Sequence, residues 1–128
     1  MPLNDMLDRL PPDGNDDLLR ARLSPPALRA YQSVCAGWQL TAVEGRRLLG
    51  VPAEIPLPLT GLRAIAAILA IHADLRHVHG EGEAIAGAWL RTPNPLPPFA
   101  GRSPLALMTQ DGEAGFQALL AFLHGWRE

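Results

Sequence analysis

The 128-residue chain contains a single cysteine and no lysine. One cysteine excludes an internal disulfide and any zinc site built from several cysteines. Cys35 lies in an apolar stretch, and we interpret it as a small buried hydrophobic residue rather than a reactive thiol. All eleven basic residues are arginines, and arginine suits paired charges at protein interfaces better than lysine does.

A strong charge of either sign is also absent. The formal net charge is -2 and the isoelectric point about 6.1, so no global field attracts this chain to nucleic acid. The longest apolar run, residues 64–71, is too short to cross a bilayer, and the N-terminus lacks the pattern of a signal peptide. We therefore expect a cytosolic protein with no membrane segment.

Groups that perform catalysis are lacking as well. The candidate nucleophiles are the hydroxyls of Ser24, Thr41, Thr60 and Ser103, and all four are better explained as helix caps. No glycine-rich loop follows a strand, and the carboxylates are scattered rather than paired. The sequence thus predicts no enzyme, no catalytic residue and no cofactor.

Three histidines, His72, His77 and His79, invite a metal interpretation. Their spacings are five and two, whereas a helical metal pair needs ligands three or four residues apart. Histidines near a helix end, where the helix dipole favours them, are the better account of His77 and His79. We predict no metal site.

What the chain does contain is apolar residues at helical spacing, and they predict an all-α fold. Ser24 followed by Pro25 and Pro26 is a helix-start signal, and Thr41 with Glu44 has the spacing of a capping box. The expected helices cover about residues 27–36, 41–49, 61–78 and 83–91, a stretch that begins at Ser103, and residues 113–126. Before them, residues 1–23 read as an arm, helical in pieces.

The first two expected helices, separated by a tight turn, resemble the first half of a helix-turn-helix, but the recognition helix is missing. In its place Pro52, Pro56 and Pro58 exclude a regular helix. Arg46 and Arg47 remain candidate phosphate contacts, although ordinary solvated surface is the better account of both. We divide the chain into an arm (1–23), a degenerate helix-turn-helix region (24–59) and a helical domain (60–128).

The longest expected helix keeps one narrow face of small and polar residues, which allows close approach of another helix from the same chain or from a second copy. That face carries Arg63, Ala67, Ala70, Asp74 and His77. The following helix is expected to bury Ile85, Trp89 and Leu90.

Residues 89–108 form a proline-rich corner between two expected helices, and we expect the other helices of the C-terminal half to pack around it. We expect Trp89 and Leu105 to anchor its two helices in the core, while residues 93–101 set the angle at which the last helix meets a partner. Within this corner Trp89-Leu90, Pro93-Asn94 and Gly101-Arg102-Ser103-Pro104-Leu105 follow one another. In this order they resemble the toxin-binding domain of the Xre/MbcA/ParS antitoxin family, and Trp38 to Gly50 is similar to that family's helix-turn-helix.

The resemblance implies a cytosolic, all-helical and usually dimeric antitoxin that masks the active site of a RES-type, NAD-consuming toxin. In this family the C-terminal end lies near the toxin's active site. The candidate toxin-binding residues are therefore Trp126, Arg127 and Glu128, together with Arg102. Two alternatives stay open: a DNA-binding repressor of its own operon, and an orphan helical scaffold. The absent recognition helix counts against the repressor, and Pro95, Pro97 and Pro98 lengthen the corner loop beyond the family pattern.

Overall fold

The computed structural model describes residues 17–79 and 83–127, and every regular element in these ranges is a helix. The expected all-α fold class is confirmed. The helices are α2 (Asp17–Gly37), α3 (Ala42–Leu49), α4 (Leu59–His79), α5 (Glu83–Arg91), α6 (Pro104–Asp111) and α7 (Glu113–Arg127). None of them is long and apolar enough to cross a membrane.

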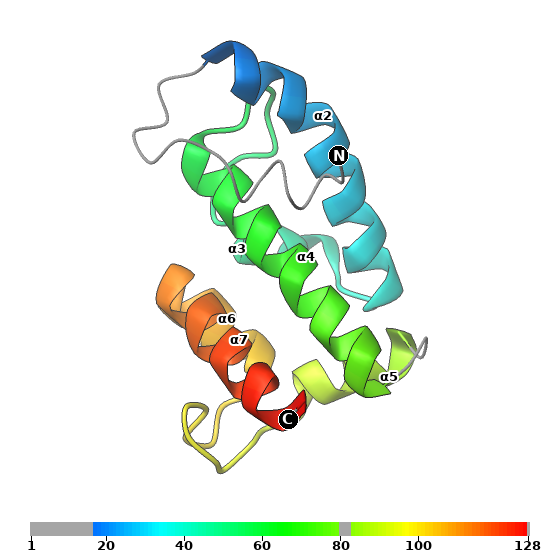
Figure 1. The fold of residues 1–128 in the computed structure, drawn as a ribbon, viewed down its shortest axis with the longest axis vertical. Helices are drawn as coiled ribbons and strands as arrows, with labels where there is room; N and C mark the ends of the chain where they lie inside the picture. Colours follow the sequence, from blue (N-terminus) through cyan, green and yellow to red (C-terminus); the bar gives the residue numbers. More distant parts are fainter. Residues whose placement is uncertain (1–16, 80–82, 128) are drawn as a thin grey trace.

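Helix α4 is the central element, with α2 packed along one side of it and the α6–α7 pair on the other side (Figure 1). Its side chains Leu62, Ile65, Ile68, Ile71 and Leu75 have no exposed surface. Each such side chain stabilises the fold by about 1.5–3 kcal/mol through burial. The expectation that most of this helix is buried is confirmed.

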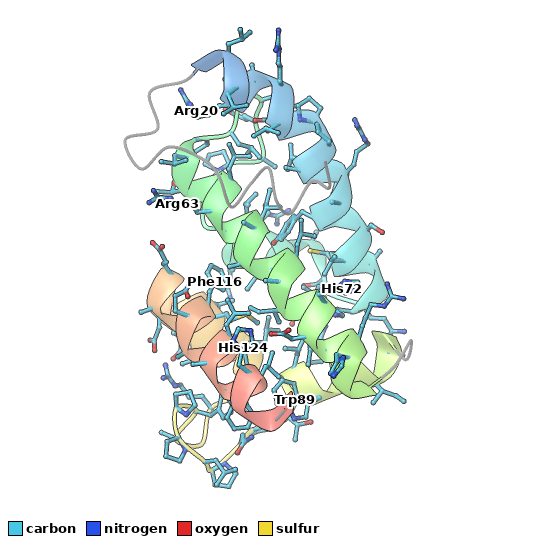
Figure 2. All side chains as sticks on the ribbon, in the orientation of Figure 1. Arg20, Arg63, His72, Trp89, Phe116 and His124 are labelled. Atoms are coloured by element: carbon cyan, nitrogen blue, oxygen red, sulfur yellow. The ribbon has the colours of Figure 1, made fainter. Side chains whose placement is uncertain are left out.

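The middle of the α4 face that carries small and polar residues is covered by α7 of the same chain, while Arg63 and His77 at its two ends are exposed. Ala67 and Asp74 are buried, and Nε2 of His124 on α7 lies 3.1 Å from Oδ2 of Asp74. Figure 2 shows His124 on the side of α7 that faces α4. Of the two partners that the sequence allowed for this face, the structure therefore selects a helix of the same chain.

The helix start expected at Ser24 is wrong, because α2 begins at Asp17 and continues through Pro25 and Pro26. Ser24 is fully buried, and its hydroxyl links α2 to the segment before α4. It donates to the Arg20 carbonyl at 2.6 Å and accepts from the Leu57 amide at 2.8 Å. Tertiary packing here outweighs the local signal. Helix α2 also crosses the expected boundary between residues 23 and 24. Residues 1–16, most of the expected arm, lie outside the described residues. Our division of the chain into three regions therefore remains a proposal.

Helix α3 has the expected caps. The Thr41 hydroxyl accepts from the Glu44 amide at 3.1 Å, and the Glu44 carboxylate accepts from the Thr41 amide at 2.8 Å. Gly50 ends the helix with φ of 77°, in the left-handed region that favours glycine. Residues 50–58 contain no helix, so the absence of a recognition helix in this segment is confirmed.

Two smaller expectations are corrected. Thr60 is not a cap, because the Leu62 amide already donates to the Pro58 carbonyl and α4 begins at Leu59. Ile85 is not buried but 60% exposed. In α5 the buried face is set by Ala86 and Gly87, whose small size lets the backbone approach α2, and the larger Ile85 is turned outward.

Candidate functional site

An aromatic cluster of Trp89, Phe99 and Phe122 holds the corner between α5 and α6 against α7. Trp89, at the end of α5, lies half-buried at the end of the molecule where α7 also ends (Figure 2). Its ring stacks on Phe122 of α7 with 6.3 Å between centroids, and it meets Phe99 edge-on at 6.2 Å. Phe99 and Phe122 are 4.9 Å apart, also edge to face. The loop and two helices thus share one rigid apolar contact.

Backbone hydrogen bonds close the corner loop at its base. The Asn94 amide donates to the Arg102 carbonyl at 3.1 Å, and the Gly101 amide donates to the Asn94 carbonyl at 2.8 Å. Gly101 has φ of 89°, which a side chain would strain. The endpoints of the loop, Pro93-Asn94 and Gly101, are therefore held together in spite of the extra prolines between them.

The tip of the loop is fixed by Leu96 and its neighbours. The Leu96 amide donates to Asn94 Oδ1 at 2.9 Å, and the Leu96 carbonyl accepts from the amides of Phe99 and Ala100. The Leu96 side chain is therefore 55% exposed, while both the amide and the carbonyl of its backbone are hydrogen-bonded.

Helix α6 begins as the sequence predicts. The Ser103 hydroxyl accepts from the Ala106 amide at 3.1 Å, and Pro104 occupies the first turn, where its missing amide hydrogen is not needed. Leu105, Leu107 and Met108 are buried. Leu90, also in the matching motif, has no exposed surface, so the motif residues anchor the corner in the core.

Arg102 contacts its own chain at the corner. Its guanidinium pairs with Asp111 at 3.1 Å and also donates to the Phe99 carbonyl and the Gln110 side chain. Hydrogen bonding to the carboxylate raises the pKa of Arg102 and lowers that of Asp111. The residue joins the loop to the end of α6 and keeps about a third of its side chain exposed. Its predicted contact with a partner remains a prediction.

Beside the loop tip lies an apolar hollow of about 700 Å³, which we call the corner hollow. Its lining comes from α5, the loop and α7: Trp89, Asn94, Leu96, Ala121, Phe122 and Gly125. Leu96, Ala121 and Phe122 are not among the site residues that the sequence predicts. Ala121 and Phe122 lie off the main apolar stripe of α7, and only the apolar character of Leu96 inside a polar and proline-rich loop gave a signal.

The last turn of α7 continues from Gly125, at the edge of the corner hollow, to Arg127. Figure 1 shows this end of α7 close to the corner loop and to α5. The side chains of Trp126 and Arg127, and Glu128 as a whole, lie outside the described residues, so their predicted roles remain predictions. The structure places the last turn of α7 next to the corner.

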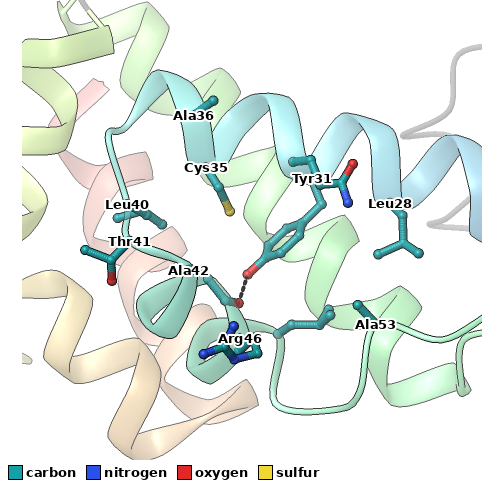
Figure 3. A pocket seen from close by; sticks show the side chains of 12 residues that line it. Leu28, Tyr31, Cys35, Ala36, Leu40, Thr41, Ala42, Arg46 and Ala53 are labelled. Atoms are coloured by element: carbon teal, nitrogen blue, oxygen red, sulfur yellow. Dashed lines mark hydrogen bonds between the residues drawn. The ribbon is translucent and has the colours of Figure 1, made fainter.

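The two other candidate residues, Arg46 and Arg47, are exposed in the last turn of α3. Arg46 lines a second apolar hollow of about 390 Å³ between α2 and α3, shown in Figure 3. There the Tyr31 hydroxyl donates to the Gly45 carbonyl, and burial raises the pKa of both Tyr31 and Cys35. Cys35 is half-buried in this wall, with its thiol held in the protonated, less reactive form.

The described residues contain no cluster of three or more histidine, cysteine or acidic side chains that could hold a metal ion. His72 instead packs against Trp38, with 6.0 Å between the ring centroids.

Comparison with known families agrees with this geometry. Residues 74–128 match the family described as the antitoxin Xre/MbcA/ParS C-terminal toxin-binding domain. The matched segment begins at Asp74 on α4 and includes α5, the corner, α6 and α7. No curated protein and no solved structure matches the chain. The resemblance read from the corner motif is thus confirmed for the segment that contains the corner hollow.

Proposed function

We propose that this chain is the antitoxin of a type II toxin–antitoxin system, because residues 74–128 match the toxin-binding domain of the Xre/MbcA/ParS antitoxin family. In this proposal it binds a RES-type, NAD-consuming toxin and masks the active site. The observation that carries the proposal is the match of residues 74–128, from the last part of α4 through α7, to a toxin-binding domain. The chain itself acts by binding and not as an enzyme.

The fixed corner supports this role, because a rigid surface loses little conformational entropy when a partner binds. Helix α7 is held by α4 and by α6, so its last turn projects from a stable base. We assign the toxin contact to Trp126, Arg127 and Glu128, which follow Gly125 in the sequence. Tryptophan and arginine are frequent binding hot spots.

The acidic end of the chain suits the proposed target. A toxin that consumes NAD must hold two phosphates, and basic residues commonly do so. The carboxylate of Glu128 would pair with such residues and compete with the dinucleotide. Arg102, which is one third exposed, contributes a second charged contact at the edge of the corner.

The family resemblance also motivates two coarser parts of the proposal. We propose a cytosolic protein and a homodimer, as is usual for antitoxins of this type. Helix α7 already covers the small-residue face of α4, so a dimer would use another surface.

The proposal is tested by co-expressing the chain with the RES-type protein encoded by the neighbouring gene. We expect the two to co-purify as a stable complex. Trp126→Ala should leave the circular dichroism and melting temperature unchanged and weaken binding by about 30-fold, the effect of a typical hot spot of about 2 kcal/mol.

Failure of the wild-type chain to co-purify with the neighbouring protein would overturn the proposed function. Unfolding of the Trp126→Ala variant would place this tryptophan in the core, and the assigned contact would then be wrong.

A further inference from the structure

We propose that the corner hollow seats an aromatic or branched aliphatic side chain of the toxin, so that binding has a second anchor besides the chain's last residues. This inference rests on the proposed function and adds a site to it. The residues that would form the anchor, Leu96, Phe122 and Gly125, are not among the candidate toxin contacts that the sequence suggests.

The floor of the corner hollow is aromatic and already fixed. Trp89 and Phe122 are nearly parallel, with 19° between their planes, and Phe99 braces both rings from the side. An incoming apolar side chain would meet large apolar surfaces that need no rearrangement. A charged side chain would lose its hydration there, and the described lining residues include no opposite charge to compensate for it.

Leu96 forms the exposed outer edge of the corner hollow, which we call its lip. More than half of this side chain is exposed, although three hydrogen bonds fix the backbone around it. Single exposed leucines are common on protein surfaces. This one differs because a rigid loop holds it beside an apolar hollow, where a side chain seated in the hollow would cover it.

The wall on α7 is made of small residues on one helical face. Ala121 and Gly125 are four residues apart, and a Cβ added to Gly125 would meet no atom within 4 Å. This open space is where a partner's side chain would fit. Asn94 is the polar residue of the lining, and its amide group marks the edge of the hollow.

The toxin is the favoured occupant because of where the corner hollow lies. All six lining residues fall within residues 74–128, the segment that matches a toxin-binding domain. The next residue after Gly125 is Trp126, the first of the proposed toxin contacts. One partner surface would therefore cover the hollow and the helix end together.

Two variants test the anchor in the full-length chain. Leu96→Asp places a charge on the lip, and Gly125→Leu fills the hollow from the α7 side. Neither should disturb the fold, because Leu96 is largely exposed and the space at Gly125 is open. The matched control is Ile85→Asp, which places the same charge on an equally exposed apolar residue of α5 outside the hollow.

Binding to the RES-type protein encoded by the neighbouring gene is then measured by titration calorimetry. We expect Leu96→Asp and Gly125→Leu each to lower the affinity by about 30-fold or more, the size of a hot-spot effect. Ile85→Asp should bind within about 3-fold of wild type, as surface positions outside a hot spot do.

The outcomes separate the two proposals. If the wild-type chain binds and both hollow variants bind equally well, the anchor is overturned while the antitoxin function stands. An equal loss with Ile85→Asp would also overturn it, because the effect would not be specific to the hollow. Dissociation of a dimer of the chain by Leu96→Asp, without loss of toxin binding, would assign the hollow to self-association instead. If the wild-type chain does not bind, the proposed function itself fails.

Discussion

At the scale of single residues, Glu44 connects three parts of the chain through one carboxylate. It caps α3 at Thr41 and pairs with Arg91 of α5, which also donates to the Gln39 carbonyl. Hydrogen bonding to Arg91, followed by the bond from the Thr41 backbone, lowers the pKa of Glu44 from 4.5 to about 2. The helix-turn-helix region is thereby tied to the corner.

The lowered pKa leads to a prediction for Glu44→Gln. Glutamine keeps the cap but loses the charge, so at pH 7 the variant should be less stable by about 1 kcal/mol or less, the range for a solvent-screened pair. A depressed pKa in the folded state means that this contribution is complete above about pH 4.5 and disappears as the pH falls toward 2. The difference in unfolding free energy between wild type and variant, measured against pH, should follow that course. A difference that does not change over this range would contradict the assigned ion pair.

Trp89 is the residue on which the corner depends. Replacing it with alanine removes the ring that contacts both Phe99 and Phe122. We expect Trp89→Ala to destabilise the protein by about 3 kcal/mol, the lower end for a large-to-small change at an aromatic residue, because the ring is only half-buried.

Urea unfolding measures this change, and Ile85→Ala on the exposed side of the same helix provides the control, with an expected change below about 0.5 kcal/mol. If the two substitutions lower the free energy of unfolding equally, the claim that the corner depends on Trp89 would be wrong.

At the scale of elements, glycine decides how closely two helices approach. A Cβ on Gly87 of α5 would overlap the carbonyl oxygen of Trp38 at the end of α2 and lie 3.0 Å from its carbonyl carbon. The obstacle is backbone, which cannot rotate away. Gly87→Ala should therefore separate α5 from α2 and cost about 1–3 kcal/mol, even though alanine favours a helix.

Gly125 supplies the control for this substitution. It also lies in a helix, but a Cβ there meets no atom within 4 Å. Gly125→Ala should be neutral or stabilising by up to about 1 kcal/mol. Thermal melts of the two variants should thus move in opposite directions, and a neutral result for Gly87→Ala would show that the close approach of the two helices is not required.

The elements also show what the sequence could predict. Where a signal is local, as in the capping box at Thr41, the cap at Ser103 and the prolines of residues 52–58, the structure agrees. Where packing competes with a local signal, the sequence misleads. Ser24 and its two prolines read as a helix start, yet the Ser24 hydroxyl bonds the Leu57 amide, 33 residues away.

The candidate site divides in the same way. The motif from Trp89 to Leu105 could be read from the sequence because it consists of a helix end, a turn and a cap. The corner hollow could not, because it arises only when α7 lies against the loop. Its residues Leu96, Ala121 and Phe122 come from two segments that no local pattern connects.

At the scale of the whole molecule, we propose that the degenerate helix-turn-helix region (24–59) serves the fold rather than DNA binding. Arg46 and Arg47 are exposed, but no helix follows α3 in residues 50–58 to enter a major groove. We expect no sequence-specific retardation of the protein's own promoter in a gel-shift assay at physiological salt, and only the weak, salt-sensitive binding of a few phosphate contacts.

The double variant Arg46→Ala with Arg47→Ala should leave toxin binding unchanged. Tight promoter binding that this double variant abolishes would instead favour the alternative of an operon repressor.

The central claim is that this chain silences an NAD-consuming toxin by covering its active site. The most direct measurement is the rate of NAD consumption by the neighbouring RES-type protein while the full-length chain is added in increasing amounts. We predict that the rate falls linearly with added chain and reaches zero at a fixed stoichiometry, and that Trp126→Ala requires a large excess to achieve the same inhibition. An undiminished rate in the presence of saturating, folded wild-type chain would contradict the account.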